Sequence, residues 1–101
     1  MSLRKQYLKT KPVCKVTFSF PKAGFGSPKS VHLVGDFNNW NKTAAPMRRL
    51  KNGSFTLTIA LERNREYQFR YLLDGQRWEN DWEADTYVPN DFGSENSVVA
   101  V

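Results

Sequence analysis

Residues 55–75 read FTLTIALERNREYQFRYLLDG, and this stretch decides the fold class. Apolar side chains take every second position from Phe55 to Leu61 and again from Tyr67 to Leu73. Because the side chains of a strand point alternately to its two faces, each run predicts a strand with one buried face. The connection between them is short and holds Asn64, the residue there that best accepts a left-handed conformation. The stretch therefore predicts two neighbouring strands.

The same alternation recurs outside this stretch. Cys14, Val16, Phe18 and Phe20 alternate with polar residues, and shorter strands are predicted at residues 31–35, 47–50, 77–79 and 97–101. Between them lie turn signals at Asn52-Gly53 and Asp74-Gly75 and a loop at residues 21–28.

About seven short strands in one chain predict an all-β fold, an antiparallel sandwich of the immunoglobulin-like type, with a small barrel as the alternative. Residues 13–101 are expected to form this domain, after a basic N-terminal segment over residues 1–12. Ser2–Lys9 is the one segment that could be helical, with Ser2 as its cap and Leu3 and Tyr7 on one face.

Length and composition exclude several classes. A chain of 101 residues is too short for a barrel enzyme of about 250 residues. The sequence has no apolar run of about 18 residues and no segment typical of a signal peptide, and Cys14 is its single cysteine. We therefore expect a cytoplasmic protein with no membrane association and no intrachain disulfide.

Charge is distributed unevenly along the chain, whose net charge is +5. Residues 1–51 hold eleven lysines and arginines and one acid, Asp36, whereas residues 52–101 hold four and nine. In a sandwich the two halves are expected to interleave, which would reduce the surface dipole. No nucleic-acid partner is predicted.

The residues with reactive side chains give little support to catalysis or metal binding. One histidine, His32, and one cysteine are too few for structural zinc, and no nucleophile motif accompanies them. Asp81, Glu83 and Asp85 have the spacing of a calcium loop, but Thr86 stands in place of its glycine. Neither a cofactor, a metal site nor a catalytic residue is predicted.

Aromatic residues are more informative. Residues 80–96 form a long stretch without periodicity that contains several aromatics, and such long loops are often functional. Phe37-Asn38-Asn39-Trp40 places two amides beside an indole in a turn. Aromatic planes stack on sugar rings and amides bind hydroxyls, so a carbohydrate site is one interpretation. The alternative is that the tryptophans belong to the core.

Four ordered motifs together resemble carbohydrate-binding module family 48. They are VHLVGDFNNW at residues 31–40, YQFRYLLDG at 67–75, WEND at 78–81 and FGSENSVV at 92–99. These early-set, immunoglobulin-like domains occur at the N-terminus of isoamylases and glycogen branching enzymes and in the beta subunits of AMP-activated protein kinase. The resemblance spans residues 13–101 and implies an α-glucan-binding face.

The resemblance implies a role for individual residues. Trp40 and Trp78 match stacking tryptophans, and Phe92 stands where a leucine threads a cyclic glucan. The remaining positions that it implies are Arg70 in place of a lysine, Ser94 in place of a threonine, and Asn96; Asn38 and Asn39 are added from the FNNW turn. The turn after Gly75 is one residue longer than in the kinase subunit, and Trp82 replaces a proline. If the loop is Asp74-Gly75-Gln76, Leu72 pairs with Trp78, and the indole lies on the face of Arg70.

These expectations lead to one hypothesis for the function and one alternative. The expected function is non-catalytic binding of α-1,4-glucans, such as glycogen or maltodextrin, by a stand-alone domain. The alternative is a module that docks onto a glycogen-metabolising enzyme without binding sugar. An enzymatic function ranks below both.

Overall fold

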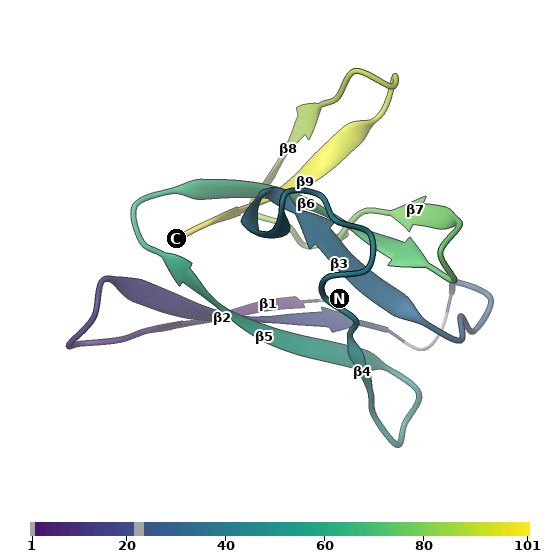
Figure 1. Ribbon diagram of the computed structural model, residues 1–101, viewed down its shortest axis with the longest axis horizontal. Helices are drawn as coiled ribbons and strands as arrows, with labels where there is room; N and C mark the ends of the chain where they lie inside the picture. The colour runs from purple at the N-terminus through teal and green to yellow at the C-terminus, as the bar shows by residue number, and fades with distance from the viewer. Residues whose placement is uncertain (1, 22–23) are drawn as a thin grey trace.

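The computed structural model describes residues 2–21 and 24–101, which form two packed antiparallel β-sheets (Figure 1). The first sheet has the strand order β1 (Ser2–Tyr7), β2 (Val13–Phe20), β5 (Phe55–Glu62) and β4 (Arg48–Arg49). The second has the order β3 (Val31–Gly35), β6 (Glu66–Leu73), β9 (Glu95–Ala100) and β8 (Thr86–Pro89), with β7 (Arg77–Glu79) also paired to β6. The all-β sandwich predicted from the alternation is confirmed.

The core lies between the sheets and consists of the alternating residues. Phe18 and Phe20 of β2 face Phe69 and Tyr71 of β6, with edge-on ring contacts at centroid distances of 5.1 Å for Phe18–Phe69 and 5.1 Å for Phe20–Tyr71. All four side chains are fully buried. Burial of these large apolar surfaces is the main favourable contribution that holds the sheets together.

The N-terminal segment is a strand, so the helix considered for Ser2–Lys9 is wrong. β1 pairs along β2 with Leu3 opposite Phe18 and Tyr7 opposite Cys14. Leu3 packs against the core, and Lys5 reaches Asp85, in the loop just before β8, at 2.8 Å. A helix would have left the edge of β2 unpaired, and the strand satisfies its backbone groups.

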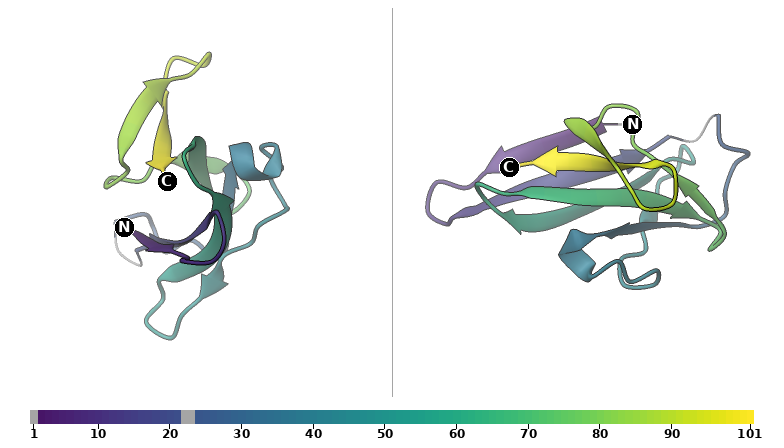
Figure 2. Two further views of the ribbon diagram at one scale, coloured as in Figure 1. Left: turned by 90° about the vertical axis from the view of Figure 1, so that its left-hand side faces the viewer. Right: turned by 90° about the horizontal axis from the view of Figure 1, so that it is seen from above.

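One edge of β6 pairs with β3, and its other edge is shared between two strands. β9 pairs with residues 66–69 and β7 with residues 71–73, so the two strands part at Arg70. Beyond that point the β8–β9 hairpin diverges from the rest of the sheet, as Figure 1 and the left view of Figure 2 show. This divergence opens the outer face of the sheet on either side of Arg70.

The turn between β6 and β7 has the predicted register. Asp74 and Gly75 both have positive φ, at 52° and 68°, and the Gln76 amide donates to the Leu73 carbonyl at 3.0 Å. Leu73 pairs with Arg77 rather than with Gln76, which makes Gln76 the extra residue of a three-residue loop. As predicted, Leu72 therefore lies opposite Trp78.

The stretch from residue 80 to residue 96 contains more regular structure than expected. Thr86–Pro89 forms β8, which pairs with β9, and β9 already begins at Glu95. The alternation of β8 is weak because three of its four residues are exposed.

The strands of the first sheet are strongly basic. The strands of the first sheet carry one acid, Glu62, against five basic residues, Arg4, Lys5, Lys15, Arg48 and Arg49. The halves of the chain interleave through β3 and β5 alone, and the asymmetry of the sequence persists in the fold. In the described part of the chain, no helix has the length and apolar character needed to cross a membrane.

Candidate functional site

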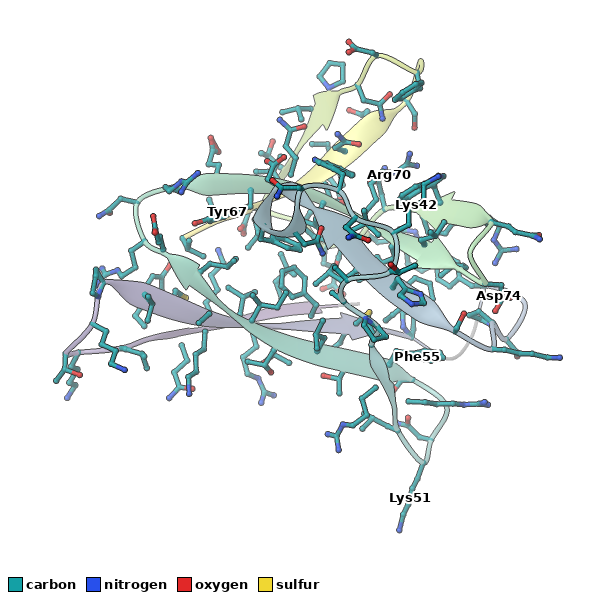
Figure 3. The ribbon with its side chains drawn as sticks, viewed as in Figure 1. Lys42, Lys51, Phe55, Tyr67, Arg70 and Asp74 are labelled. Atoms are coloured by element: carbon teal, nitrogen blue, oxygen red, sulfur yellow. The ribbon has the colours of Figure 1, made fainter. Side chains whose placement is uncertain are left out.

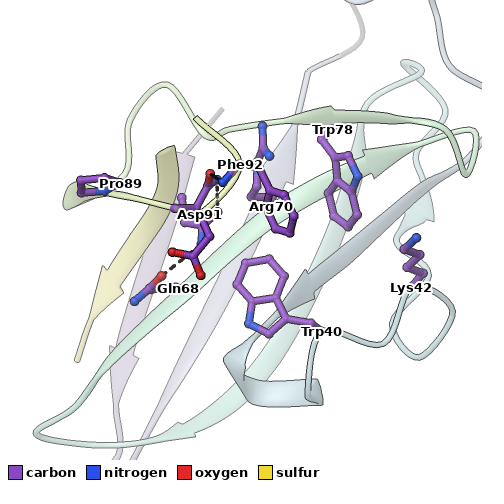
Figure 4. Close-up of a pocket in the computed structure, with 10 residues that line it drawn as sticks. Trp40, Lys42, Gln68, Arg70, Trp78, Pro89, Asp91 and Phe92 are labelled. Carbon is purple, nitrogen blue, oxygen red and sulfur yellow. Dashed lines mark hydrogen bonds between the residues drawn. The ribbon is translucent and has the colours of Figure 1, made fainter. Parts of the chain in front are cut away.

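A groove of about 760 Å³ runs over the outer face of the five-stranded sheet (Figure 4). Its lining comes from the turn after β3, from β6, β7 and β9, and from the tip of the β8–β9 hairpin. The residues are Trp40, Lys42, Gln68, Arg70, Trp78, Pro89, Asn90, Asp91, Phe92 and Asn96. Five of the eight residues predicted as sugar ligands meet here: Trp40, Arg70, Trp78, Phe92 and Asn96.

Trp40 reaches the groove through a tight turn after β3. The chain leaves β3 through a short 3-10 helix, η1 (Asp36–Asn38), and Asn39 and Trp40 then take left-handed conformations with φ of 55° and 56°. The Trp40 amide donates to the Gly35 carbonyl at 2.9 Å, which closes the turn. Left-handed backbone is costly for a tryptophan, and such strain is typical of residues held for function.

Asp36 fixes the direction of the Trp40 ring. Its Oδ1 accepts a hydrogen bond from the indole Nε1 of Trp40 at 2.9 Å, and its Oδ2 accepts one from the backbone amide of Gln68 at 2.8 Å. One carboxylate therefore ties the ring to β6. Asp36 was not among the site residues predicted from the sequence, because its role depends on a strand more than 30 residues away.

Arg70 and Trp78 lie next to each other on the outer face. The guanidinium carbon of Arg70 is 5.8 Å from the centroid of the Trp78 ring. Burial lowers the pKa of Arg70 because it disfavours the charged form, and the negative charge of Glu79 opposes this shift. The indole offers a flat apolar face, and the guanidinium beside it offers hydrogen-bond donors.

Three amides form a chain along the groove floor. Asn96 donates from Nδ2 to Gln68 Oε1 at 3.0 Å and accepts at Oδ1 from Asn90 Nδ2 at 3.1 Å. Asn90 Oδ1 in turn accepts the backbone amides of Phe92 and Ser94. Asn96 is nearly buried, at 9% exposed, so its amide is held in one orientation. Fixed amides of this kind can both donate to and accept from sugar hydroxyls.

Phe92 stands at the tip of the β8–β9 hairpin. Its side chain is 92% exposed, which is unusual for an aromatic residue, yet its backbone is held by Asn90. Figure 4 shows Phe92 next to Arg70. An exposed apolar ring on a fixed loop is suited to lateral contact with a ligand.

Three predicted ligands lie outside the groove lining. Both polar atoms of Asn38 bond to backbone, with Nδ2 donating to the Leu33 carbonyl and Oδ1 accepting from the Gly35 amide. Asn39 is exposed in the left-handed position that ends η1. Ser94 is exposed on the hairpin, with its amide bonded to Asn90. The geometry gives Asn38 a structural role, while roles for Asn39 and Ser94 in sugar binding stay predictions.

Trp82 is the third tryptophan and lies away from the groove. It is 64% exposed, and its ring packs on Phe25 at a centroid distance of 4.9 Å. Next to it, Asp81 is fully buried and accepts hydrogen bonds from the Tyr71 hydroxyl at 2.7 Å and the Glu83 amide at 2.8 Å. Burial raises the pKa of Asp81, and these hydrogen bonds partly offset the rise.

Lys42, Gln68 and Asn90 are further groove residues that the sequence analysis did not select. Gln68 could have been found, because it is two residues from Arg70 on the same strand face. Lys42 has no such signal, since it belongs to an irregular segment. Its Nζ lies 6.0 Å from the Trp78 ring centroid.

The chain resembles known proteins in sequence and in fold. The sequence profile of carbohydrate-binding module 48 (isoamylase N-terminal domain) matches residues 27–88. No curated protein matches the chain in sequence. The enterobactin esterase of Shigella flexneri has a similar fold, with a TM-score of 0.70 at 12% identity. That match covers 98% of this chain and 32% of the esterase, so the chain spans about a third of the larger protein, and the likeness concerns the fold alone.

Proposed function

Because the chain belongs to the carbohydrate-binding module 48 family, we propose that its groove binds α-1,4-glucans such as glycogen and maltodextrins, without catalysis. One observation carries the proposal. Two partly buried tryptophan rings, Trp40 and Trp78, line a single groove together with the guanidinium of Arg70 and the amides of Gln68 and Asn96. Aromatic planes and fixed hydrogen-bonding groups are the two kinds of contact that a glucose unit requires.

The aromatic and the polar residues of the groove have different proposed roles. Trp40 and Trp78 stack on glucose rings, and Phe92 contacts the glucan from the side. Arg70 donates to hydroxyls, and Asn96 both donates and accepts. The groove is open and stacks few rings, so the expected affinity for maltoheptaose is micromolar to millimolar, about −4 to −8 kcal/mol.

The proposed setting is the cytoplasm, in keeping with a single cysteine, Cys14, that is buried and free. A glycogen-metabolising enzyme is the proposed protein partner. A module that docks onto such an enzyme without binding sugar is the alternative to glucan binding.

Affinity electrophoresis in a gel that contains glycogen tests the proposal. The wild-type chain is expected to be retarded relative to a gel without glycogen, and Trp40→Ala is expected to lose the retardation. Trp82→Ala is the matched control, because it removes an exposed indole outside the groove. No retardation of the wild type would favour the docking alternative, and loss of retardation in both variants would contradict binding in this groove.

A further inference from the structure

Two positive charges border Trp78 at one end of the groove. The Lys42 ammonium lies 6.0 Å and the Arg70 guanidinium 5.8 Å from the centroid of the indole ring. Figure 3 shows both side chains on the β3–β6 side of the molecule, far from Lys51 at the tip of the β4–β5 hairpin. They come from the segment after η1 and from β6, so the fold brings them together.

In the part of the chain that the structure describes, neither charge has a carboxylate as a direct partner. Within residues 2–21 and 24–101, no carboxylate lies within 4.0 Å of the Lys42 ammonium or the Arg70 guanidinium. The Nε of Arg70 is buried and has no hydrogen-bond acceptor in that part of the chain. Glu79 acts on Arg70 through its charge, but its carboxylate is 3.7 Å from Arg77 Nε. The Trp78 end of the groove is therefore electropositive.

A neutral sugar accounts for one of these charges, the Arg70 guanidinium that donates to hydroxyls, but not for a second cation beside the same ring. Stacking on Trp78 needs an apolar ring face, and hydroxyls need dipoles such as the amides of Gln68 and Asn96. Two cations beside one ring repel each other, and partial burial disfavours the charge of Arg70. An anion placed between them would offset both costs, and the planar guanidinium matches an anionic group with two oxygens.

Among the described residues that line the groove, the one carboxylate, Asp91, is at its other end. In Figure 4, Asp91 lies on the hairpin side and Lys42 beyond Trp78, with the stacking surface between them. An anionic ligand group would be repelled near Asp91 and attracted near Lys42. The charges therefore give the groove a direction for a charged ligand.

We propose that the Trp78 end of the groove binds an anionic substituent, a phosphate monoester or a carboxylate, carried by an α-glucan. The inference rests on the proposed glucan binding and adds the substrate class. Lys42 and Arg70 hold the anionic group beside the glucose unit stacked on Trp78.

Titration calorimetry compares three ligands on the full chain: maltoheptaose, maltoheptaose with one C6 phosphate, and maltoheptaose with one C6 carboxylate. At about 50 mM salt the phosphorylated ligand is expected to bind about tenfold more tightly than the neutral one, and at about 500 mM this ratio should fall severalfold through screening. A larger gain for phosphate than for carboxylate identifies a phosphate site. Equal gains identify a site for anionic groups in general.

Lys42→Met and Arg70→Gln should each reduce the ratio of anionic to neutral affinity to about threefold or less. Lys51→Met removes the same charge from an exposed lysine outside the groove and should leave the ratio unchanged. Equal affinity for all three ligands would overturn the inference while leaving glucan binding intact. A ratio that Lys51→Met lowers as much as Lys42→Met would also overturn it. Tight binding of the phosphorylated ligand alone, dependent on Lys42, would support the inference and contradict the proposed binding of neutral glucan.

Discussion

The Asp36 carboxylate accepts the indole hydrogen of Trp40 at 2.9 Å and thereby holds the ring at the edge of the groove. The same carboxylate accepts the Gln68 amide from β6 at 2.8 Å, so the ring is fixed relative to the sheet. Trp40 is in a left-handed conformation, which Asp36 and the closing bond to Gly35 stabilise. A ring that is held before binding loses less conformational freedom when a sugar stacks on it.

Asp36→Ala should therefore weaken binding of maltoheptaose by about tenfold, equivalent to about 1.4 kcal/mol, because the ring of Trp40 is no longer held. Calorimetry measures the affinity, and urea unfolding measures the stability. Asp74→Ala is the matched control, since Asp74 Oδ1 also accepts two backbone amides, those of Lys29 and Ser30, away from the groove. If the two variants bind alike, Asp36 supports the fold rather than the site.

Phe69→Ala separates the core from the site. Phe69 is fully buried, with its ring 5.1 Å from Phe18 and 5.8 Å from Tyr71, and its removal should cost about 3–5 kcal/mol of unfolding free energy. Trp40→Ala should cost less than about 1.5 kcal/mol, because the indole is only partly buried. Urea unfolding measures the loss of unfolding free energy in both variants and so shows which side chain belongs to the core. An equal loss in Trp40→Ala would place that tryptophan in the core.

Gly35 allows β3 to approach β6 closely. A Cβ at this position would lie 2.4 Å from the Gln68 carbonyl oxygen and 2.8 Å from the Phe69 Cβ, and neither can move without shifting the strand. Gly35→Ala should therefore cost about 3 kcal/mol or more, whereas Gly26→Ala, with open space around its Cβ, should cost about 1 kcal/mol for its positive φ. Equal losses in urea unfolding would contradict the close approach.

The buried carboxyl of Asp81 should make stability depend on pH. Burial raises its pKa, so from about pH 4 upward the folded chain binds more protons than the unfolded chain. The contribution of Asp81 to stability therefore falls as pH rises through this window. Asp81→Asn should remove this pH-dependent component, because an amide does not titrate. The variant should still fold, since the amide can accept from the Glu83 amide and donate to the Tyr71 hydroxyl.

Urea unfolding between about pH 4 and pH 8 tests this prediction. Asp91→Asn, at an exposed hairpin position, is the control and should retain the dependence of the wild type. A slope that is the same in Asp81→Asn and in the wild type would show that Asp81 does not titrate differently in the two states.

Strands with a strong core face could be predicted from the sequence. Cys14–Phe20 and Tyr67–Leu73 alternate because one face meets the opposite sheet, and this pattern appears directly in the chain. The register of Trp78 also followed from one extra residue in the turn. Edge strands were harder to predict from the sequence, because β1 and β8 are stabilised by pairing with a neighbour rather than by a buried face of their own.

The candidate site was predictable as far as side-chain type carries the signal. Aromatic residues in turns pointed to Trp40, and strand periodicity placed Arg70 and Trp78 on one face. The structural roles of Asp36 and Asn38 were not predictable, since each depends on which backbone group lies within hydrogen-bond distance after folding. Lys42 joins the groove through the path of an irregular segment, which no periodicity describes.

A proton–nitrogen correlation spectrum, recorded during titration with maltoheptaose, tests glucan binding most directly. The three indole Nε1–H signals are assigned by replacing Trp40, Trp78 and Trp82 one at a time with phenylalanine. Glucan binding in this groove predicts saturable shifts of the Trp40 and Trp78 signals, with a dissociation constant between about 1 μM and 1 mM, and no shift of the Trp82 signal. Indole signals that stay unchanged at several millimolar ligand, or a shift of Trp82 alone, would contradict glucan binding in this groove.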